Sequence, residues 1–274
     1  MRKNLKNHNK YHTETLNQST RRRALRTIAG VLVGTSAVGT VGARNQITEI
    51  DEPTVIDEPG EYVLTSDITS VDIPIIRIEA DRVTLNGTGH TLAGDFRSPG
   101  WSQPGIEANG VKNVNIQDVT VTNFGRGISI TNAKNCSVKG VTATQCRTSG
   151  ITIQTSNSAV QGNTLRNIYK GTGIHVGGSN NTVAENDIGS LDTGLILKGP
   201  STKVRNNTVD RTVEGIVIYG NNQFLTNNTI TNSDIWGVYI SNSINNKIIQ
   251  NYFQYARISG DTENSIIRAN EIDE

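Results

Sequence analysis

A repeat of about 22 residues constrains the fold of this chain more than any other feature. The pattern apolar-x-x-Asn-x-apolar occurs first as VQGNTL (residues 160–165) and last as IRANEI (residues 267–272). Its asparagines follow one another at spacings of 23, 21, 21, 23 and 19 residues, at Asn163, Asn186, Asn207, Asn228, Asn251 and Asn270. Two earlier copies put Val119 and Val141 in this column. Such a period is typical of solenoid proteins.

A second column keeps the same register. A glycine precedes an aliphatic residue at spacings of 22, 23, 23, 21, 21 and 22, at Gly105, Gly127, Gly150, Gly173, Gly194, Gly215 and Gly237. The triplet NNT at residues 206–208 and 227–229 also matches the Asn-x-Thr acceptor for glycosylation. Because two columns share one period, we interpret NNT chiefly as part of the repeat.

The residues within each repeat predict strands. Stretches such as GISI, GITI and GIVI alternate in and out of a sheet, and helix-forming runs are nearly absent. A period of about 22 residues is shorter than the roughly 30 of a strand–helix–strand unit. The sequence therefore predicts a β-solenoid with three short strands per turn and about nine turns, stacked about 4.8 Å apart. We expect the asparagines to adopt the left-handed backbone at a sharp turn and to form a ladder.

The segments GEYVLTSDIT (residues 60–69) and IRIEADRVTLNGTGHTLAGD (residues 76–95), followed by the NNTI-type copies, resemble a known group. They are similar to right-handed parallel β-helix proteins of the NosD-like and carbohydrate-binding/sugar-hydrolase type, over residues 47–274. The resemblance implies an all-β, right-handed parallel β-helix. We expect an N-terminal cap with the first strands over residues 44–75 and the parallel β-helix over residues 76–274.

The first 43 residues differ from the rest. TRRRALR (residues 20–26) precedes an apolar run over residues 28–41 and a small-residue site, which is typical of an export signal. The adjacent arginines resemble the twin-arginine signal, although Ala24 replaces its phenylalanine. We therefore predict a signal peptide over residues 1–43 and a secreted protein, extracellular or at the cell surface, that meets the membrane only during export. An uncleaved amphipathic anchor remains an alternative.

The charge balance argues against a nucleic-acid partner. The chain has 26 Lys/Arg and 25 Asp/Glu, and the first 43 residues hold eight of the basic and one of the acidic residues. Removal of that segment leaves 18 basic and 24 acidic residues, a net charge of about −6, whereas nucleic-acid binders carry basic patches.

Cys136 and Cys146 are the only cysteines. They fall in one turn but on different walls of the predicted solenoid. We favour two buried free thiols over a disulfide, which remains the alternative.

The strand that begins at the glycine column is the candidate functional face. One outward column is predicted at Glu107, Ser129, Thr152, His175, Ile196, Val217 and Tyr239. The next is predicted at Asn109, Thr131, Gln154, Gly177, Lys198, Tyr219 and Ser241. The candidate catalytic residues are His175, Lys198, Tyr219 and Tyr239, because proton abstraction beside a uronate carboxylate needs a base, an acid and a cation.

Four further residues are candidates for substrate binding: Trp101, Gln154, Glu214 and Trp236. Trp101 lies in the loop DFRSPGWSQP (residues 95–104), which either overhangs the face or caps the rod. Trp236 and Tyr239 either stack on sugars or plug the end of the solenoid. Glycosidase chemistry would need two facing carboxylates, and Asp192 with Glu214 is the best pair available.

No metal site and no cofactor is expected. A copper role is attached to the NosD name, but the only methionine is Met1, and His90 and His175 are widely separated in the sequence, whereas copper delivery uses clustered Met, Cys or His. We expect a β-helix that binds or processes a polysaccharide or cell-surface glycan. Whether it is an enzyme stays open. The alternatives are a non-catalytic structural or adhesive surface protein and a copper-maturation accessory.

Overall fold

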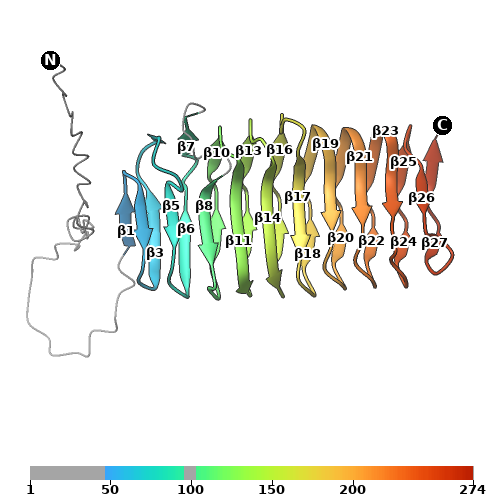
Figure 1. Cartoon of the computed structure of the whole chain (residues 1–274), viewed down its shortest axis with the longest axis horizontal. Helices are drawn as coiled ribbons and strands as arrows, with labels where there is room; N and C mark the ends of the chain where they lie inside the picture. The colour runs from blue at the N-terminus through green and yellow to red at the C-terminus, as the bar shows by residue number, and fades with distance from the viewer. Residues whose placement is uncertain (1–46, 96–102, 274) are drawn as a thin grey trace, which may run out of the picture.

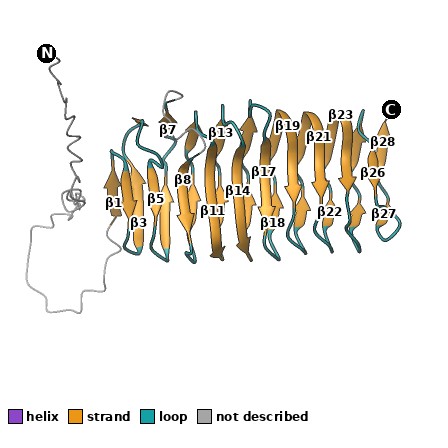
Figure 2. Cartoon of the chain, in the orientation of Figure 1, coloured by secondary structure: helices purple, strands orange, loops and turns teal. Residues whose placement is uncertain are grey.

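The computed structural model describes residues 47–95 and 103–273, and all regular structure in these residues is β-strand. The strands stack along one axis, with the first turns at one end of the rod and the last turns at the other (Figure 1). Short loops join consecutive strands at the corners of each turn (Figure 2). All pairings between the strands are parallel, for example β12 with β15 and β14 with β17.

Wall 1 of the solenoid is a sheet of eleven strands, to which each turn contributes one strand. Its strands are β1 (Ile47–Ile50), β3 (Gly60–Leu64), β6 (Val83–Asn86), β9 (Asn115–Gln117), β12 (Ser137–Lys139), β15 (Ala159–Gln161), β18 (Thr182–Ala184), β20 (Lys203–Arg205), β22 (Phe224–Thr226), β24 (Lys247–Ile249) and β27 (Ile266–Arg268).

Walls 2 and 3 belong to one sheet of seventeen strands that bends at a corner. Wall 2 contains β4 (Ile68–Ser70), β7 (Thr91–Gly94), β10 (Thr120–Thr122), β13 (Thr142–Thr144), β16 (Thr164–Arg166), β25 (Tyr252–Gln254) and β28 (Glu271–Asp273). Wall 3 contains β2 (Thr54–Ile56), β5 (Ile76–Ile78), β8 (Pro104–Asn109), β11 (Arg126–Lys134), β14 (Ser149–Ser156), β17 (Thr172–Gly177) and β26 (Ile258–Gly260). Three long strands pass around the corner and join both walls: β19 (Asp187–Leu197), β21 (Thr208–Ile218) and β23 (Thr229–Ile240).

The predicted register of the glycine column is confirmed. Ile128 pairs with Ile151, and Ile151 pairs with Ile174, so the aliphatic residues after the glycines stack turn upon turn. These side chains point inward and are completely buried. Val138 and Val160 of wall 1 are at most 1 % exposed. Burial of such columns from all three walls forms one continuous apolar core, which supplies the main driving force for folding.

The asparagine ladder is also confirmed. The side-chain Nδ2 of each asparagine donates to the Oδ1 of the next, at 2.8 Å from Asn163 to Asn186 and 2.9 Å from Asn186 to Asn207. The backbone N–H of Asn163 donates to the same Oδ1 of Asn186, at 3.0 Å. The ladder therefore satisfies buried polar groups at the corner between walls 1 and 2, where no strand pairing is available.

The predicted backbone of these asparagines is wrong. The left-handed residue is the one before each ladder position, for example Gly162 (φ 64°), Glu185 (φ 59°) and Asn206 (φ 56°). The physical reason is that two consecutive residues have different roles at this corner. The left-handed residue turns the chain and leaves its side chain outside, whereas the following asparagine points into the core and is nearly fully buried.

The corner between walls 3 and 1 uses the same device less regularly. The backbone N–H of Ser158 donates to Asn181 Oδ1 at 3.0 Å, and that of Gln223 donates to Asn246 Oδ1 at 3.0 Å. Thr202 occupies the position between Asn181 and Gln223, and its buried Oγ1 has no hydrogen-bond partner among the described residues. Threonine is too short to continue the ladder, so it is interrupted at this turn.

Both cysteines are buried free thiols, as predicted. Cys136 lies at the corner before β12 of wall 1, and Cys146 follows β13 of wall 2. Burial raises the pKa of the Cys146 thiol to about 12 and also raises the pKa of Cys136.

At the N-terminal end, the strands of residues 47–70 pair directly with the turns that follow. β1 pairs with β3, and β4 pairs with β7. The predicted signal peptide, residues 1–43, lies outside the described residues, and the predicted domain boundaries stay a prediction. Within the described parts of the chain, no helix has the length and apolar character needed to cross a membrane.

Candidate functional site

The glycines of wall 3 create an extra outward position in each turn. In β14 the side chains of Ser149 and Thr152 lie on either side of Gly150 and Ile151, and their hydroxyl oxygens are 2.7 Å apart. A Cβ on Gly150 would come within 2.5 Å of Leu165 Cδ2 and 3.0 Å of the Gly173 carbonyl oxygen, so any larger residue here would force its neighbours to shift. The outward face therefore carries three columns, at one position before the glycine and at two and four positions after it.

These columns enclose a hollow of about 390 Å³ over β11, β14 and β17. It is lined by Arg126, Ser129, Thr131, Thr148, Ser149, Thr152, Gln154, Thr172 and His175. Ser129 and Thr152 are each only 6 % exposed although they point outward, because longer side chains of the flanking columns stand around them. The floor of the hollow thus presents hydroxyl groups, which both donate and accept hydrogen bonds.

His175 forms one end of the hollow. It lies beside Thr152 in the register, and its Nε2 is buried without a hydrogen-bond partner among the described residues. Burial lowers the pKa of His175, and the positive charges of Lys198 and Arg126 lower it further. The imidazole is therefore neutral at pH 7, and its Nε2 is covered by the protein instead of facing the hollow.

Two apolar residues separate His175 from the predicted catalytic residue Tyr239. The register runs from His175 to Ile196, then to Val217 and to Tyr239. Val217 is only 3 % exposed, because it lies between Ile196 and Tyr239 in the column. Three strand spacings of about 4.8 Å place Tyr239 roughly 14 Å from His175 along the axis.

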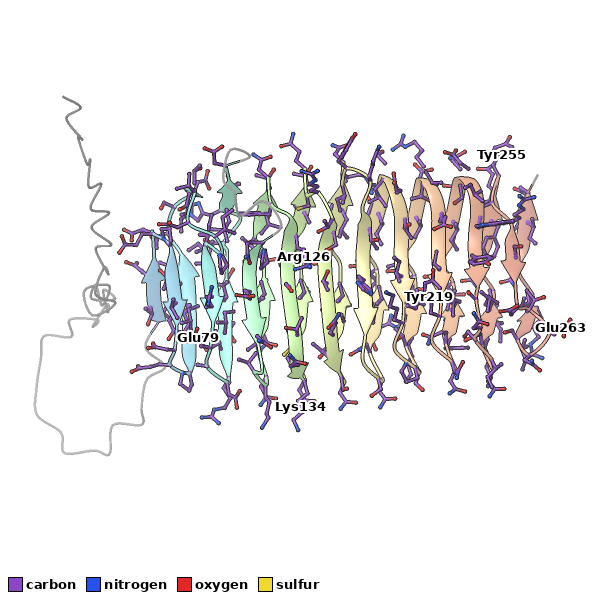
Figure 3. All side chains as sticks on the ribbon, viewed as in Figure 1. Glu79, Arg126, Lys134, Tyr219, Tyr255 and Glu263 are labelled. Atoms are coloured by element: carbon purple, nitrogen blue, oxygen red, sulfur yellow. The ribbon has the colours of Figure 1, made fainter. Side chains whose placement is uncertain are left out.

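The other two predicted catalytic residues lie on adjacent turns beyond the ends of their strands. Lys198 and Tyr219 are both exposed, Tyr219 at 46 %. Lys198 is close enough to His175 to affect its pKa. Figure 3 labels Arg126 and Tyr219, which lie in this order along the stack. The structure thus groups His175, Lys198 and Arg126, with Tyr239 farther along the face, and the catalytic roles stay a prediction.

An aromatic cluster lies on the same face toward the C-terminal end. The rings of Trp236 and Tyr239 stack with centroids 5.8 Å apart and an interplanar angle of 21°. The guanidinium of Arg257 lies 4.3 Å from the centroid of the Trp236 ring and donates from Nε to the Ile235 carbonyl at 3.2 Å. Neither ring plugs the end of the rod, because both belong to β23 on the outward surface of wall 3.

The candidate carboxylate pair is not aligned. The register opposes Glu214 to Thr193, whose Oγ1 donates to Glu214 Oε2 at 3.4 Å, and opposes Leu191 to Thr212. Asp192 is an exposed residue between the paired positions. The described lining of the hollow contains no carboxylate. The paired acids that glycosidases place around the scissile bond are thus not found in the hollow.

The sequence identified part of this site. Gln154 lines the hollow, Glu214 and Trp236 lie farther along the face, and Trp101 lies outside the described residues, so the binding roles of all four stay a prediction. The sequence pattern did not indicate Arg126 and Ser149, because strict alternation does not predict a third outward column. The signal that marks this column is the glycine itself, which interrupts the alternation at every turn.

The family resemblance implies copper, and the described residues do not fit it. They contain no group of three or more His, Cys, Asp or Glu able to hold a metal ion. His90 contacts Asp67, with 3.2 Å between Nδ1 and Oδ1, on wall 2 rather than near His175. Burial disfavours the thiolates of Cys136 and Cys146, which are the forms that bind copper.

Comparison with solved structures places the fold among β-helix proteins. A tailspike protein mutant of E. coli bacteriophage HK620 in complex with a pentasaccharide matches with a TM-score of 0.57 and 9% identity, over 78% of this chain and 54% of that chain. The chain thus spans about half the length of this tailspike.

Two epimerases match similarly. The A-module of the Azotobacter vinelandii mannuronan C-5 epimerase AlgE6 has a TM-score of 0.60 and 11% identity, over 83% of this chain and 89% of that one. The periplasmic alginate epimerase AlgG has a TM-score of 0.57 and 12% identity, over 78% of this chain and 69% of that one. At these identities the likeness shows the fold.

Comparison of sequences gives the family. No curated protein matches the chain significantly. The family described as "Periplasmic copper-binding protein (NosD)" matches residues 78–271, which is more than half of the chain. The chain therefore belongs to the NosD family.

Proposed function

We propose that the protein binds a polysaccharide across wall 3, outside the cytoplasm. The observation that carries this proposal is the presence of two complementary surfaces on one face. One is the hydroxyl-lined hollow around Thr152, and the other is the stacked pair Trp236–Tyr239. Sugar rings present hydroxyl groups at their edges and apolar C–H faces, so the first surface suits the edges and the second suits the faces.

The relation of these surfaces to the rod axis supports the proposal. The register places His175 and Tyr239 in one column with Ile196 and Val217 between them. A chain of several sugar rings laid along the rod would touch the hollow, cross the apolar residues and reach the aromatic rings. The structural neighbours support a glycan partner, since one was solved with a pentasaccharide and two are alginate or mannuronan epimerases.

The family description and the periplasmic epimerase support a location outside the cytoplasm. The export signal predicted over residues 1–43 agrees with this location.

Processing of the bound chain would depend on His175. Its lowered pKa keeps the imidazole in the neutral form that accepts a proton, and Lys198 lies on the adjacent turn. Binding does not require this step, so the two activities are tested separately.

The test is a pull-down of the full chain on insoluble acidic and neutral polysaccharides, with chain length and the ultraviolet absorbance of unsaturated ends followed in parallel. We expect wild-type protein to be retained by at least one glycan. Thr152→Gln fills the floor of the hollow and should weaken retention, whereas Thr226→Gln on wall 1 should not. Retention by no glycan, or equal retention of the two variants, would contradict the proposal, and product formation lost in His175→Ala would establish processing.

A further inference from the structure

Arg126, beside the hollow, differs from most of the other arginines in the strands of the solenoid. Four arginines elsewhere each lie against a carboxylate: Arg77 against Glu107, Arg166 against Asp187, Arg205 against Glu185 and Arg211 against Asp210. Arg126, which lines the hollow, is exposed and has no carboxylate partner among the described residues. Lys198 on the far side of His175 is likewise exposed and unpaired within the described part of the chain.

Arg126 and Lys198 both influence the same residue, His175. The charges of Arg126 and Lys198 each disfavour protonation of His175, so both lie within electrostatic reach of its ring. The nearest acid in the same outward column is Glu107, one turn before Ser129, and Arg77 neutralises it at 3.6 Å. The hollow therefore has Arg126 in its lining and Lys198 beside His175, while its described lining contains no acid to pair with them.

The polar groups of the hollow suit an anion. Ser149 and Thr152 share one hydrogen bond, so one hydroxyl hydrogen of the pair is left to donate outward, and Gln154 at the rim has an amide donor. A carboxylate is an acceptor only, so it would accept from these groups while Arg126 and Lys198 balance its charge. A neutral sugar would leave both cations unpaired.

We propose that the hollow over β11, β14 and β17 binds the carboxylate of a uronic-acid residue, with Arg126 and Lys198 as its counter-charges. The inference rests on the proposed binding of a polysaccharide and names the class of sugar. Arg126 belongs to the outward column before the glycines, and Lys198 belongs to the column four residues after them. The two cations therefore flank the site from different columns of the face. Their positions select an acidic sugar, and the aromatic pair is free to bind any ring.

The test is isothermal titration of the full chain with oligogalacturonate and oligomannuronate, each compared with its methyl ester. The ester keeps the ring and the hydroxyl groups and removes only the charge. We expect at least one of the two acids to bind about tenfold more tightly than its ester. The affinity for that acid should fall as salt is added. Arg126→Gln and Lys198→Gln should each weaken binding of the acid by about tenfold and leave the ester unaffected. Lys203→Gln, an exposed lysine on β20 of wall 1, is the matched control.

The outcomes separate this inference from the proposed function. Equal binding of acid and ester overturns the inference and leaves glycan binding in place. Binding of neither, together with no retention on any glycan, overturns both. A preference for the acid that survives in Arg126→Gln and Lys198→Gln overturns the assignment to this hollow. Since both side chains are exposed, the variants should keep the thermal unfolding midpoint of the wild type, which confirms that they fold.

Discussion

The Nδ2 of Asn207 donates to the Oδ1 of Asn228 at 2.9 Å, and the backbone N–H of Asn207 donates to the same oxygen at 3.1 Å. One side-chain oxygen thus accepts two hydrogen bonds from the preceding turn. The Nδ2 of Asn207 also donates to the Val183 carbonyl at 3.0 Å. Each ladder asparagine therefore connects three consecutive turns, and the corner depends on all of them.

The substitution Asn207→Ala should destabilise the rod strongly. It leaves the backbone N–H of Asn186 and the Val183 carbonyl without these partners in a buried corner, so we expect a loss of roughly 2–4 kcal/mol of unfolding free energy. The measurement is the midpoint of urea unfolding. Asn264→Ala, at an exposed asparagine near the C-terminal end, should shift the midpoint little. Similar shifts for the two variants would show that the ladder does not hold the corner together.

The glycine column should tolerate no side chain. A Cβ on Gly194 would lie 2.5 Å from the Gly215 carbonyl oxygen and 2.6 Å from Val209 Cγ1, so Gly194→Ala should cost about 2 kcal/mol or more. Gly177→Ala is the control, because its Cβ would meet nothing closer than Gln154 Cγ at 3.3 Å. Thermal unfolding of both variants makes the comparison. A midpoint for Gly194→Ala as high as that for Gly177→Ala would contradict the close packing at the column.

The repeat made the fold predictable, and the same regularity hid part of the site. Columns at a fixed period reveal the ladder at Asn207 and the inward residues such as Ile151, because every turn imposes the same requirement on those positions. The hollow arises where turns differ: Ser129 and Thr152 are short, while Arg126 and Gln154 beside them are long. Such a difference in side-chain length has no periodic signal, and the outward position of Arg126 depends on Gly127, which lies between the paired positions Arg126 and Ile128.

The two thiols should be unreactive in the folded protein. Because burial raises the pKa of Cys146 to about 12, its thiolate is scarce at pH 8, and the same direction holds for Cys136. We expect neither thiol to react with Ellman's reagent in buffer at pH 8 and both to react in guanidinium. The raised pKa also means that the Cys146 contribution to stability is complete below the ordinary value of 9.0 and is lost as the pH rises toward about 12. Rapid reaction of a thiol in native protein would contradict its burial.

The aromatic pair should contribute to glycan binding independently of the hollow. Trp236→Ala removes a ring that stacks on Tyr239 and contacts the guanidinium of Arg257. We expect this variant to bind any glycan that the wild type retains with an affinity about two- to tenfold lower. Phe224→Ala is the matched control, because Phe224 is an exposed ring on β22 of wall 1. The measurement is affinity electrophoresis in gels that contain the glycan. Equal effects of the two substitutions would place the ligand elsewhere than along wall 3.

His175 should titrate below its ordinary pKa because of burial and the two nearby cations. The imidazole proton resonances, followed by NMR against pH and assigned with His175→Gln, measure this pKa directly. Lys198→Gln and Arg126→Gln should each raise this pKa, since each removes a positive charge, whereas Lys203→Gln should not.

The sign for stability follows from the same shift: protonation is easier in the unfolded chain, so the contribution of His175 to stability is present above pH 6.5 and is lost as the pH falls through the lowered pKa. Bound uronate would place a negative charge beside the ring and raise the pKa again. An imidazole that titrates normally, with no response to either charge removal, would show that the two cations do not converge on this residue.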